Sequence, residues 1–117
     1  SAEHYKVKKV QKAVDIFKNK YPNIINDGEM QFDAAIDREV SNKKISNPIL
    51  DGNANTFIFP DLNSANIAYK ITQYLAGYTA WGPLLQGFNK PVHDLSRGCS
   101  VDDIISVSAI SAMQSIK

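Results

Sequence analysis

The chain has 117 residues, 44% of them hydrophobic and 21% charged, and a formal net charge of +1. A length of this order fits one domain with one core, and the ordinary composition excludes a disordered chain, a collagen and a repeat array. The near-neutral charge gives no reason to expect binding to nucleic acid or to a membrane surface. One cysteine fits a reducing compartment, and no apolar run approaches the ~20 residues of a membrane span. These properties indicate a cytoplasmic domain.

The first half of the chain contains two helix patterns. Hydrophobic side chains at helical spacing predict a helix over residues 3–20, with lysines on the remaining positions. Tyr21-Pro22 ends this helix, because proline disfavours helical backbone at the residue before it. Residues 24–25 are a candidate for a short strand, and residues 32–40 predict a second, short helix. Residues 41–54 are rich in Ser, Asn, Lys, Pro and Gly, and predict an irregular loop.

A strand and a capped helix are predicted in the middle of the chain. Residues 56–59 are β-branched and aromatic, which favours a buried strand. Asp61 or Ser64 can cap a helix that runs to about Ala76, and Gly77 is placed to end it in the left-handed conformation. The side chains expected to face inward from this helix are Ile67, Ile71, Tyr74 and Leu75.

The last third of the chain predicts two short strands and a helix. Residues 78–85 form the first strand, and residues 91–94 form a second strand that could pair back on it after a turn. Ser100 caps the final helix. The resulting order, helix-strand-helix-strand-helix-strand-strand-helix, predicts the α/β class: a layered domain built on a mixed sheet.

The densest group of polar residues lies at residues 94–103, between a strand end and a helix start, where α/β proteins usually bind ligands. The free backbone N–H groups of a helix N-terminus attract an anion. The planar guanidinium of Arg97 can bind phosphate through two hydrogen bonds. Gly98 lets the backbone come close to a ligand or adopt a positive φ. The segment therefore predicts a phosphate site, with an ordinary surface arginine as the open alternative.

Three motifs in order give a family resemblance. Residues 82–100 read GPLLQGFNKPVHDLSRGCS, residues 27–35 read DGEMQFDAA, and residues 58–62 read IFPDL, followed by NIAYK at 66–70. Together they resemble the C-terminal signature of the phosphate acetyltransferase (phosphotransacetylase) family over nearly all of the chain. The resemblance implies that residues 1–117 are a single C-terminal portion of a phosphate acetyl/butyryl transferase whose N-terminal portion is absent.

The resemblance also implies a fold and an activity. The fold expected from it is the isocitrate/isopropylmalate dehydrogenase type, in which two α/β domains flank an active-site cleft. The expected reaction is acetyl-CoA plus phosphate giving coenzyme A plus acetyl phosphate, by direct attack of the coenzyme A thiolate on acetyl phosphate. Coenzyme A and phosphate are substrates, and no metal and no permanently bound cofactor are expected. Relatives form homodimers, and a piece without the N-terminal portion is expected to have little or no activity.

At matching positions the resemblance assigns site residues. Ser96 and Arg97 line the active site: Ser96 positions the thiol, while Arg97 binds the phosphoryl group with Gly98 beside it. Asp103 is the general base that takes the thiol proton. A competing interpretation is that Ser100 and Asp103 form a capping box, in which the carboxylate only bonds the cap residue's N–H. A thiol near 8.5 and a carboxyl near 4 differ by about 4.5 pKa units, so transfer to Asp103 requires a raised pKa or a concerted step.

Three alternatives stay open at this stage. Cys99 could act as a nucleophile, since a helix N-terminus can lower a thiol pKa, with His93 as the only nearby histidine. His93 stands where relatives usually have asparagine. The chain could instead resemble the non-catalytic phosphotransacetylase-like region of some malic enzymes, or a phosphate butyryltransferase.

Overall fold

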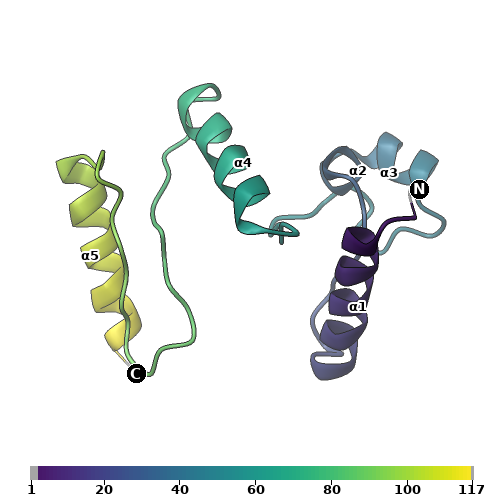
Figure 1. Cartoon of the computed structure of the whole chain (residues 1–117), viewed down its shortest axis with the longest axis horizontal. Helices are drawn as coiled ribbons and strands as arrows, with labels where there is room; N and C mark the ends of the chain where they lie inside the picture. Colours follow the sequence, from purple (N-terminus) through teal and green to yellow (C-terminus); the bar gives the residue numbers. More distant parts are fainter. Residues whose placement is uncertain (1–2, 117) are drawn as a thin grey trace. The chain divides into compact units, whose positions relative to one another are not determined.

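The structure is a computed structural model that describes residues 3–116. Within this range its elements are the helices α1 (Tyr5–Lys20), α2 (Phe32–Ile36), α3 (Arg38–Lys44), α4 (Leu62–Tyr74) and α5 (Val101–Ser115) (Figure 1). The chain divides into two compact units, Ser1–Ala65 and Asn66–Lys117, which are described separately below.

The first helix confirms the prediction made for residues 3–20. Helix α1 begins after His4, whose ring Nδ1 accepts a hydrogen bond from the Lys6 backbone N–H at 3.3 Å. It ends where the Tyr21 N–H donates to the Phe17 carbonyl at 2.8 Å, directly before Pro22. Two lysines, at positions 18 and 20, lie in the last turn, where positive charge interacts favourably with the helix dipole.

The prediction of one helix over residues 32–40 is wrong, because Asp37 divides it into α2 and α3. The Asp37 backbone is extended (φ −122°, ψ 121°), and its N–H donates to the Asp33 carbonyl, which ends α2. Its side chain then accepts a hydrogen bond from the Val40 N–H at 2.9 Å and caps α3. One aspartate therefore ends one helix and begins the next, and the two short helices pack on each other around the buried Ala34 and Ala35.

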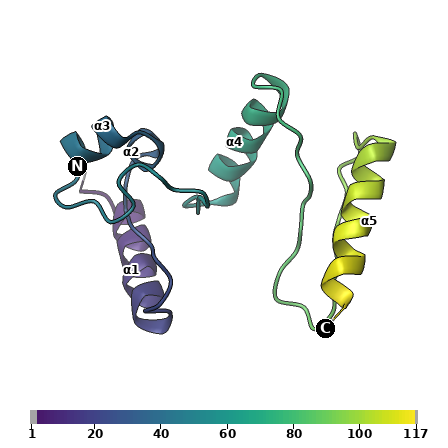
Figure 2. The same cartoon turned by 180° about the vertical axis from the view of Figure 1, so that it is seen from behind.

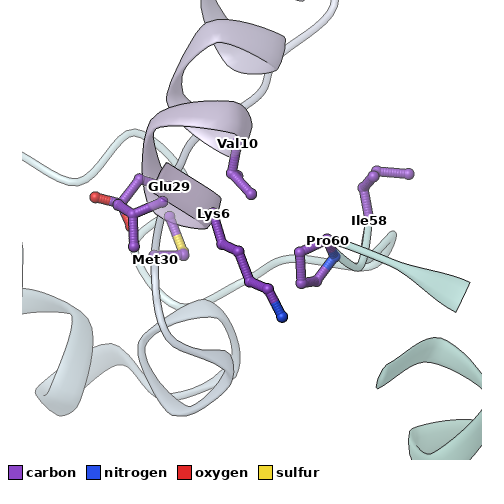
Figure 3. Close-up of a pocket in the computed structure, with 7 residues that line it drawn as sticks. Lys6, Val10, Glu29, Met30, Ile58 and Pro60 are labelled. Atoms are coloured by element: carbon purple, nitrogen blue, oxygen red, sulfur yellow. The ribbon is translucent and has the colours of Figure 1, made fainter. Parts of the chain in front are cut away.

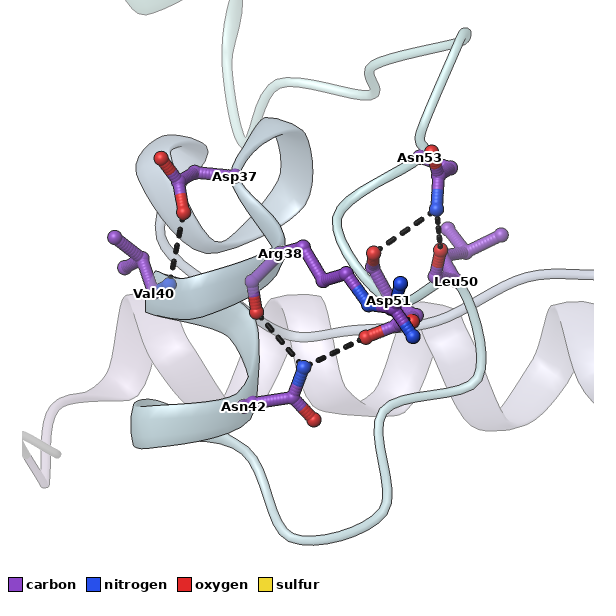
Figure 4. Close-up of polar contacts among 7 residues, drawn as sticks. All are labelled: Asp37, Arg38, Val40, Asn42, Leu50, Asp51 and Asn53. Carbon is purple, nitrogen blue, oxygen red and sulfur yellow. Dashed lines mark hydrogen bonds and ion pairs between the residues drawn. The ribbon is translucent and has the colours of Figure 1, made fainter.

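The loop after α3 is irregular, as predicted, and a polar network holds it against that helix (Figure 4). The Arg38 guanidinium pairs with the Asp51 carboxylate at 2.8 Å. The Asn42 side-chain amide donates to the Arg38 carbonyl at 2.9 Å and to the Asp51 carboxylate at 2.8 Å. Asp27 contributes a third attachment, because its Oδ2 accepts the Ile49 N–H at 2.7 Å. The loop therefore has a defined shape without regular secondary structure.

Helices α4 and α5 begin at predicted caps, and α4 ends at Tyr74, close to the predicted end near Ala76. The Asp61 carboxylate accepts the Ser64 N–H at 2.9 Å at the start of α4, and Gly77 follows its end with φ +71°. Ser100 caps α5. The predicted pairing of residues 91–94 with the preceding strand is present as a single antiparallel bridge between Leu84 and His93.

Within residues 3–116 no strand ladder forms, and the other segments predicted as strands run without a partner strand. The mixed sheet therefore stays a prediction. Few side chains are buried in the described part of the chain: Ala34, Ala35, Ser41 and Val107. Large hydrophobic side chains lie exposed instead, including Leu75 at 83% and Ile67 at 61%, which were expected to face inward from α4. No helix in the described range has the length and apolar character to cross a membrane.

Candidate functional site

The candidate site begins with a tight turn over residues 96–99. The Cys99 N–H donates to the Ser96 carbonyl at 3.0 Å, and the Gly98 N–H donates to the Ser96 hydroxyl oxygen at 3.3 Å. Arg97 and Gly98 occupy the exposed middle of this turn. Arg97 forms no ion pair with any other residue between 3 and 116. Its guanidinium is therefore open to an anionic ligand within this part of the chain.

Gly98 does not adopt the positive φ that its sequence position allowed. A Cβ built on it would meet nothing within 4 Å. The turn itself therefore accepts a side chain at this position. If glycine is required here, the requirement comes from a group that approaches the turn and not from the backbone conformation.

Asp103 and Ser100 form the capping box that was the competing interpretation of Asp103. The Asp103 Oδ2 accepts hydrogen bonds from the Ser100 backbone N–H at 2.8 Å and from the Ser100 hydroxyl at 2.9 Å. The Asp103 N–H donates back to the Ser100 Oγ at 3.2 Å. These bonds, the backbone one first, lower the pKa of the Asp103 carboxyl because they favour its charged form. The carboxylate is thus a weaker base here than an ordinary one. Its other oxygen, Oδ1, has no hydrogen-bond partner among the described residues.

His93 lies before the turn and uses both ring nitrogens. Its Nδ1 accepts the Leu85 N–H at 3.2 Å, and its Nε2 lies 2.8 Å from the side-chain oxygen of Gln114. Because Nδ1 accepts a hydrogen bond, the proton of the neutral ring is on Nε2 and is donated to Gln114. No sequence signal pointed to Gln114, which lies 21 residues from His93 in an ordinary helix position.

The arrangement argues against Cys99 as a nucleophile activated by His93. A cysteine nucleophile of that kind needs a base within hydrogen-bond reach of its thiol. Both nitrogens of His93 are already engaged, one with the Leu85 N–H and one with Gln114. Cys99 itself is partly buried and takes part in the turn through its backbone N–H. Its packing role is therefore favoured over a chemical one.

A hollow in the first unit is a second feature that could hold a small molecule (Figure 3). Its lining is mostly apolar, and the charged side chains around it are those of Lys6 and Glu29. The Lys9 ammonium donates to the Pro60 carbonyl at 2.9 Å nearby. The lining includes none of the residues predicted for the site, and no group of three or more potential metal ligands occurs between residues 3 and 116.

Comparison with known proteins identifies the family. The family described as "Phosphate acetyl/butaryl transferase" matches residues 1–112, which is nearly the whole chain. The chain belongs to this family. It is 49% identical over 114 residues to a phosphate acetyltransferase from Paracoccus denitrificans and 51% identical over 114 residues to one from Acetivibrio thermocellus. Each alignment covers 97% of this chain, but only 36% and 34% of the respective relative.

A solved structure supports the same relationship. The chain superposes on a phosphotransacetylase from Staphylococcus aureus with a TM-score of 0.90 and 50% sequence identity, over 99% of this chain and 36% of that one. The chain therefore spans about a third of the length of these relatives. The resemblance inferred from the three sequence motifs is thus confirmed at the level of the family.

Proposed function

We propose that the chain is part of a phosphate acetyltransferase, which moves an acetyl group between coenzyme A and inorganic phosphate. The observation that carries the proposal is the exposed Ser96–Cys99 turn. It presents Arg97, which has no ion-pair partner in the described range, directly before the capped start of α5. Relatives named phosphate acetyltransferase at about 50% identity favour acetyl as the transferred group. The reducing cytoplasm, which fits a single cysteine, is the proposed location.

In the proposed reaction the sulfur of coenzyme A, becoming a thiolate as its proton passes to Asp103, attacks the carbonyl carbon of acetyl phosphate directly. A carbon–sulfur bond forms, the bond between the carbonyl carbon and the bridging oxygen breaks, and phosphate leaves with the electron pair of that bond. Arg97 binds the phosphoryl oxygens through its two-pronged guanidinium and stabilises the charge that grows on them. The Ser96 hydroxyl, which already accepts the Gly98 N–H, is oriented to position the thiol. No metal and no permanently bound cofactor take part in this scheme.

Asp103 is the proposed base, and its geometry constrains how it acts. Its Oδ2 is occupied by Ser100, so the thiol proton goes to Oδ1 while the cap stays intact. The lowered pKa of this carboxyl widens its gap to a thiol. Proton transfer to Asp103 is therefore concerted with attack on the carbonyl and does not precede it.

The exposed apolar side chains support an assembly larger than this chain. Ile58 is 90% exposed and Leu75 is 83% exposed, although both lie in segments with buried-type sequence patterns. We propose that residues 1–117 are the C-terminal portion of a longer protein. Its α/β fold, with a mixed sheet of the isocitrate/isopropylmalate dehydrogenase type, would give the extended segments their partner strands. A homodimer would cover further apolar surface. The 117-residue chain alone is then expected to have little or no activity.

The test measures acetyl phosphate formation by the full-length protein and by three variants. Arg97→Ala is expected to lower kcat/KM by about 10²- to 10³-fold, as for loss of one donor to a developing anion. Asp103→Asn is expected to lower it by at least about 10²-fold, the contribution typical of a general base. Gly98→Ala fits the turn, so a large loss there reports crowding of the ligand and not misfolding.

Each outcome has a defined meaning. A full-length protein that does not convert acetyl-CoA and phosphate to acetyl phosphate overturns the proposed function. An active protein in which Asp103→Asn retains wild-type kcat/KM makes that carboxylate a helix cap only. If Arg97→Ala retains wild-type activity, the Ser96–Cys99 turn does not bind the phosphoryl group.

A further inference from the structure

We infer that His93 is a positioning residue, which fixes the place of the Ser96–Arg97 turn along α5 by joining the preceding hairpin to the last turn of that helix. The inference rests on the proposed function for its effect on catalysis. The contacts that carry it lie within the second unit and depend on no other part of the chain.

Residues 93–100 form a strap that runs beside α5 in the opposite direction, from its last turn to its first (Figures 1 and 2). One end is fixed where the imidazole of His93 bonds Gln114. The other end is fixed where Ser100 forms the capping box with Asp103. The Ser96–Cys99 turn lies between these two attachments, and its position depends on both of them.

The backbone of the strap is about as long as the helix beside it. From Val101 to Gln114 the helix rises about 20 Å at ~1.5 Å per residue. From His93 to Ser100, a tight turn spans at most ~7 Å, and the remaining links add at most ~3.6 Å each, so the strap reaches about 21 Å. The bond from His93 to Gln114 and the capping box at Ser100 therefore attach the two ends of the strap to the two ends of α5. Loss of the His93 bond leaves the Arg97 turn attached to α5 only through Ser100, so the turn can move along the helix.

The imidazole is suited to this role because its two nitrogens act on different segments. The Nδ1 atom accepts the Leu85 N–H and so closes the hairpin beside the Leu84–His93 bridge. The Nε2 atom donates to Gln114 on α5. An asparagine at position 93 could present Oδ1 to the Leu85 N–H but could not reach Gln114. The variant His93→Asn therefore removes the attachment to α5 and retains the hairpin bond.

The experiment is a double-mutant cycle in the full-length protein, with His93→Asn, Gln114→Met and the double variant. Methionine has a length similar to that of glutamine but offers no comparable acceptor. Each single variant is expected to lower kcat/KM for acetyl phosphate by about tenfold, chiefly through a higher KM, because loss of this hydrogen bond allows the turn to move. A tenfold change corresponds to about 1.4 kcal/mol. The double variant is expected to lose no more than either single variant, because both remove the same attachment. Ser115→Ala, next to Gln114 in the sequence, is the matched control and is expected to retain wild-type kinetics.

A spectroscopic measurement on the same proteins tests the bond without relying on catalysis. In protein labelled with ¹⁵N-histidine, the His93 ring nitrogens are expected to show Nε2 protonated and Nδ1 unprotonated, with the signals assigned by their loss in His93→Asn. The Nε2 signal is expected to shift in Gln114→Met and to stay unchanged in Ser115→Ala.

The two readouts separate failure of the inference from failure of the proposed function. Wild-type kinetics in Gln114→Met, or losses that multiply to about a hundredfold in the double variant, would overturn the positioning role. If the full-length protein catalyses no acetyl transfer, the proposed function fails, and the Nε2–H signal alone decides whether His93 bonds Gln114. A signal that is unchanged in Gln114→Met overturns the inference in either case.

Discussion

Gly52 lies in the loop after α3 at a position where an added methyl group has no room. Its φ is +75°, and a Cβ there would lie 2.4 Å from the Arg38 backbone nitrogen and 2.5 Å from the Asp37 carbonyl carbon. Gly77, after α4, has nearly the same φ of +71°, but nothing lies within 4 Å of its Cβ position. The pair Gly52→Ala and Gly77→Ala therefore separates the cost of the steric overlap from the cost of a left-handed alanine.

The magnitudes follow from these two geometries. A left-handed alanine costs about 1–2 kcal/mol, and the reduced freedom of the unfolded chain offsets about 0.4–1 kcal/mol of this. Gly77→Ala is therefore expected to lower the free energy of unfolding by about 1 kcal/mol. At Gly52 the overlap is with backbone, which cannot rotate away as a side chain can. The forced shift of the backbone adds about 1–3 kcal/mol, so Gly52→Ala is expected to cost about 2–4 kcal/mol.

The measurement is urea unfolding of the full-length protein, comparing the midpoints of the two variants at equal slope. The Gly52→Ala midpoint is expected to fall by at least twice as much as that of Gly77→Ala. Equal midpoints would refute the reasoning, because they would mean that the loop at Gly52 moves away from Arg38 at no cost. In that case the polar network around Asp51 would not define the loop's shape.

Three further predictions concern the caps, an ion pair and the core. Ser100→Ala removes the α5 cap and is expected to lower the free energy of unfolding by about 1 kcal/mol, measured by urea unfolding, with Thr at this position retaining most of it. Lys44→Met removes the hydrogen bond that most lowers the pKa of the Asp33 carboxyl. The stabilisation from that pair is present at pH values above the ordinary carboxyl pKa and is lost as the pH falls through the lowered pKa. In the variant, the pKa of Asp33 measured by NMR titration is expected to rise toward that of an ordinary carboxyl. Val107→Ala truncates a side chain that is 4% exposed, and it is expected to lower the free energy of unfolding by about 2 kcal/mol in the same urea measurement. An unchanged free energy of unfolding would mean that α5 is not packed on that face.

Local signals in the sequence predicted the helices and their ends. Gly77 has no side chain and can adopt the left-handed conformation after α4. The side chains of Ser100 and Asp61 bond backbone groups a few residues away, so their capping follows from spacing alone. Asp37 was missed although it has the same chemistry. Aspartate is tolerated inside a helix and is favoured at its start, and neither Gly nor Pro marked the break.

The candidate site was predictable to the extent that it is contiguous. Ser96 and Arg97 share one turn because they are neighbours in the chain, and the capping box was visible as a three-residue spacing. The bond between His93 and Gln114 was not predictable, since it joins residues 21 positions apart whose types occur widely. Strand partners are equally non-local. The extended segments carried a strand pattern, but such a pattern does not indicate which strands would pair with them.

In a protein that keeps both His93 and Gln114, the attachment of the strap at both ends of α5 restricts how the lengths of these segments can vary. Adding or removing one residue between His93 and Ser100 would change the length of the strap by about 3 Å, and so would displace the turn between the two attachments. A longer helix would in turn need a longer strap. Insertions and deletions in this region should therefore occur in compensating pairs, or be confined to the hairpin tip and to the chain beyond α5.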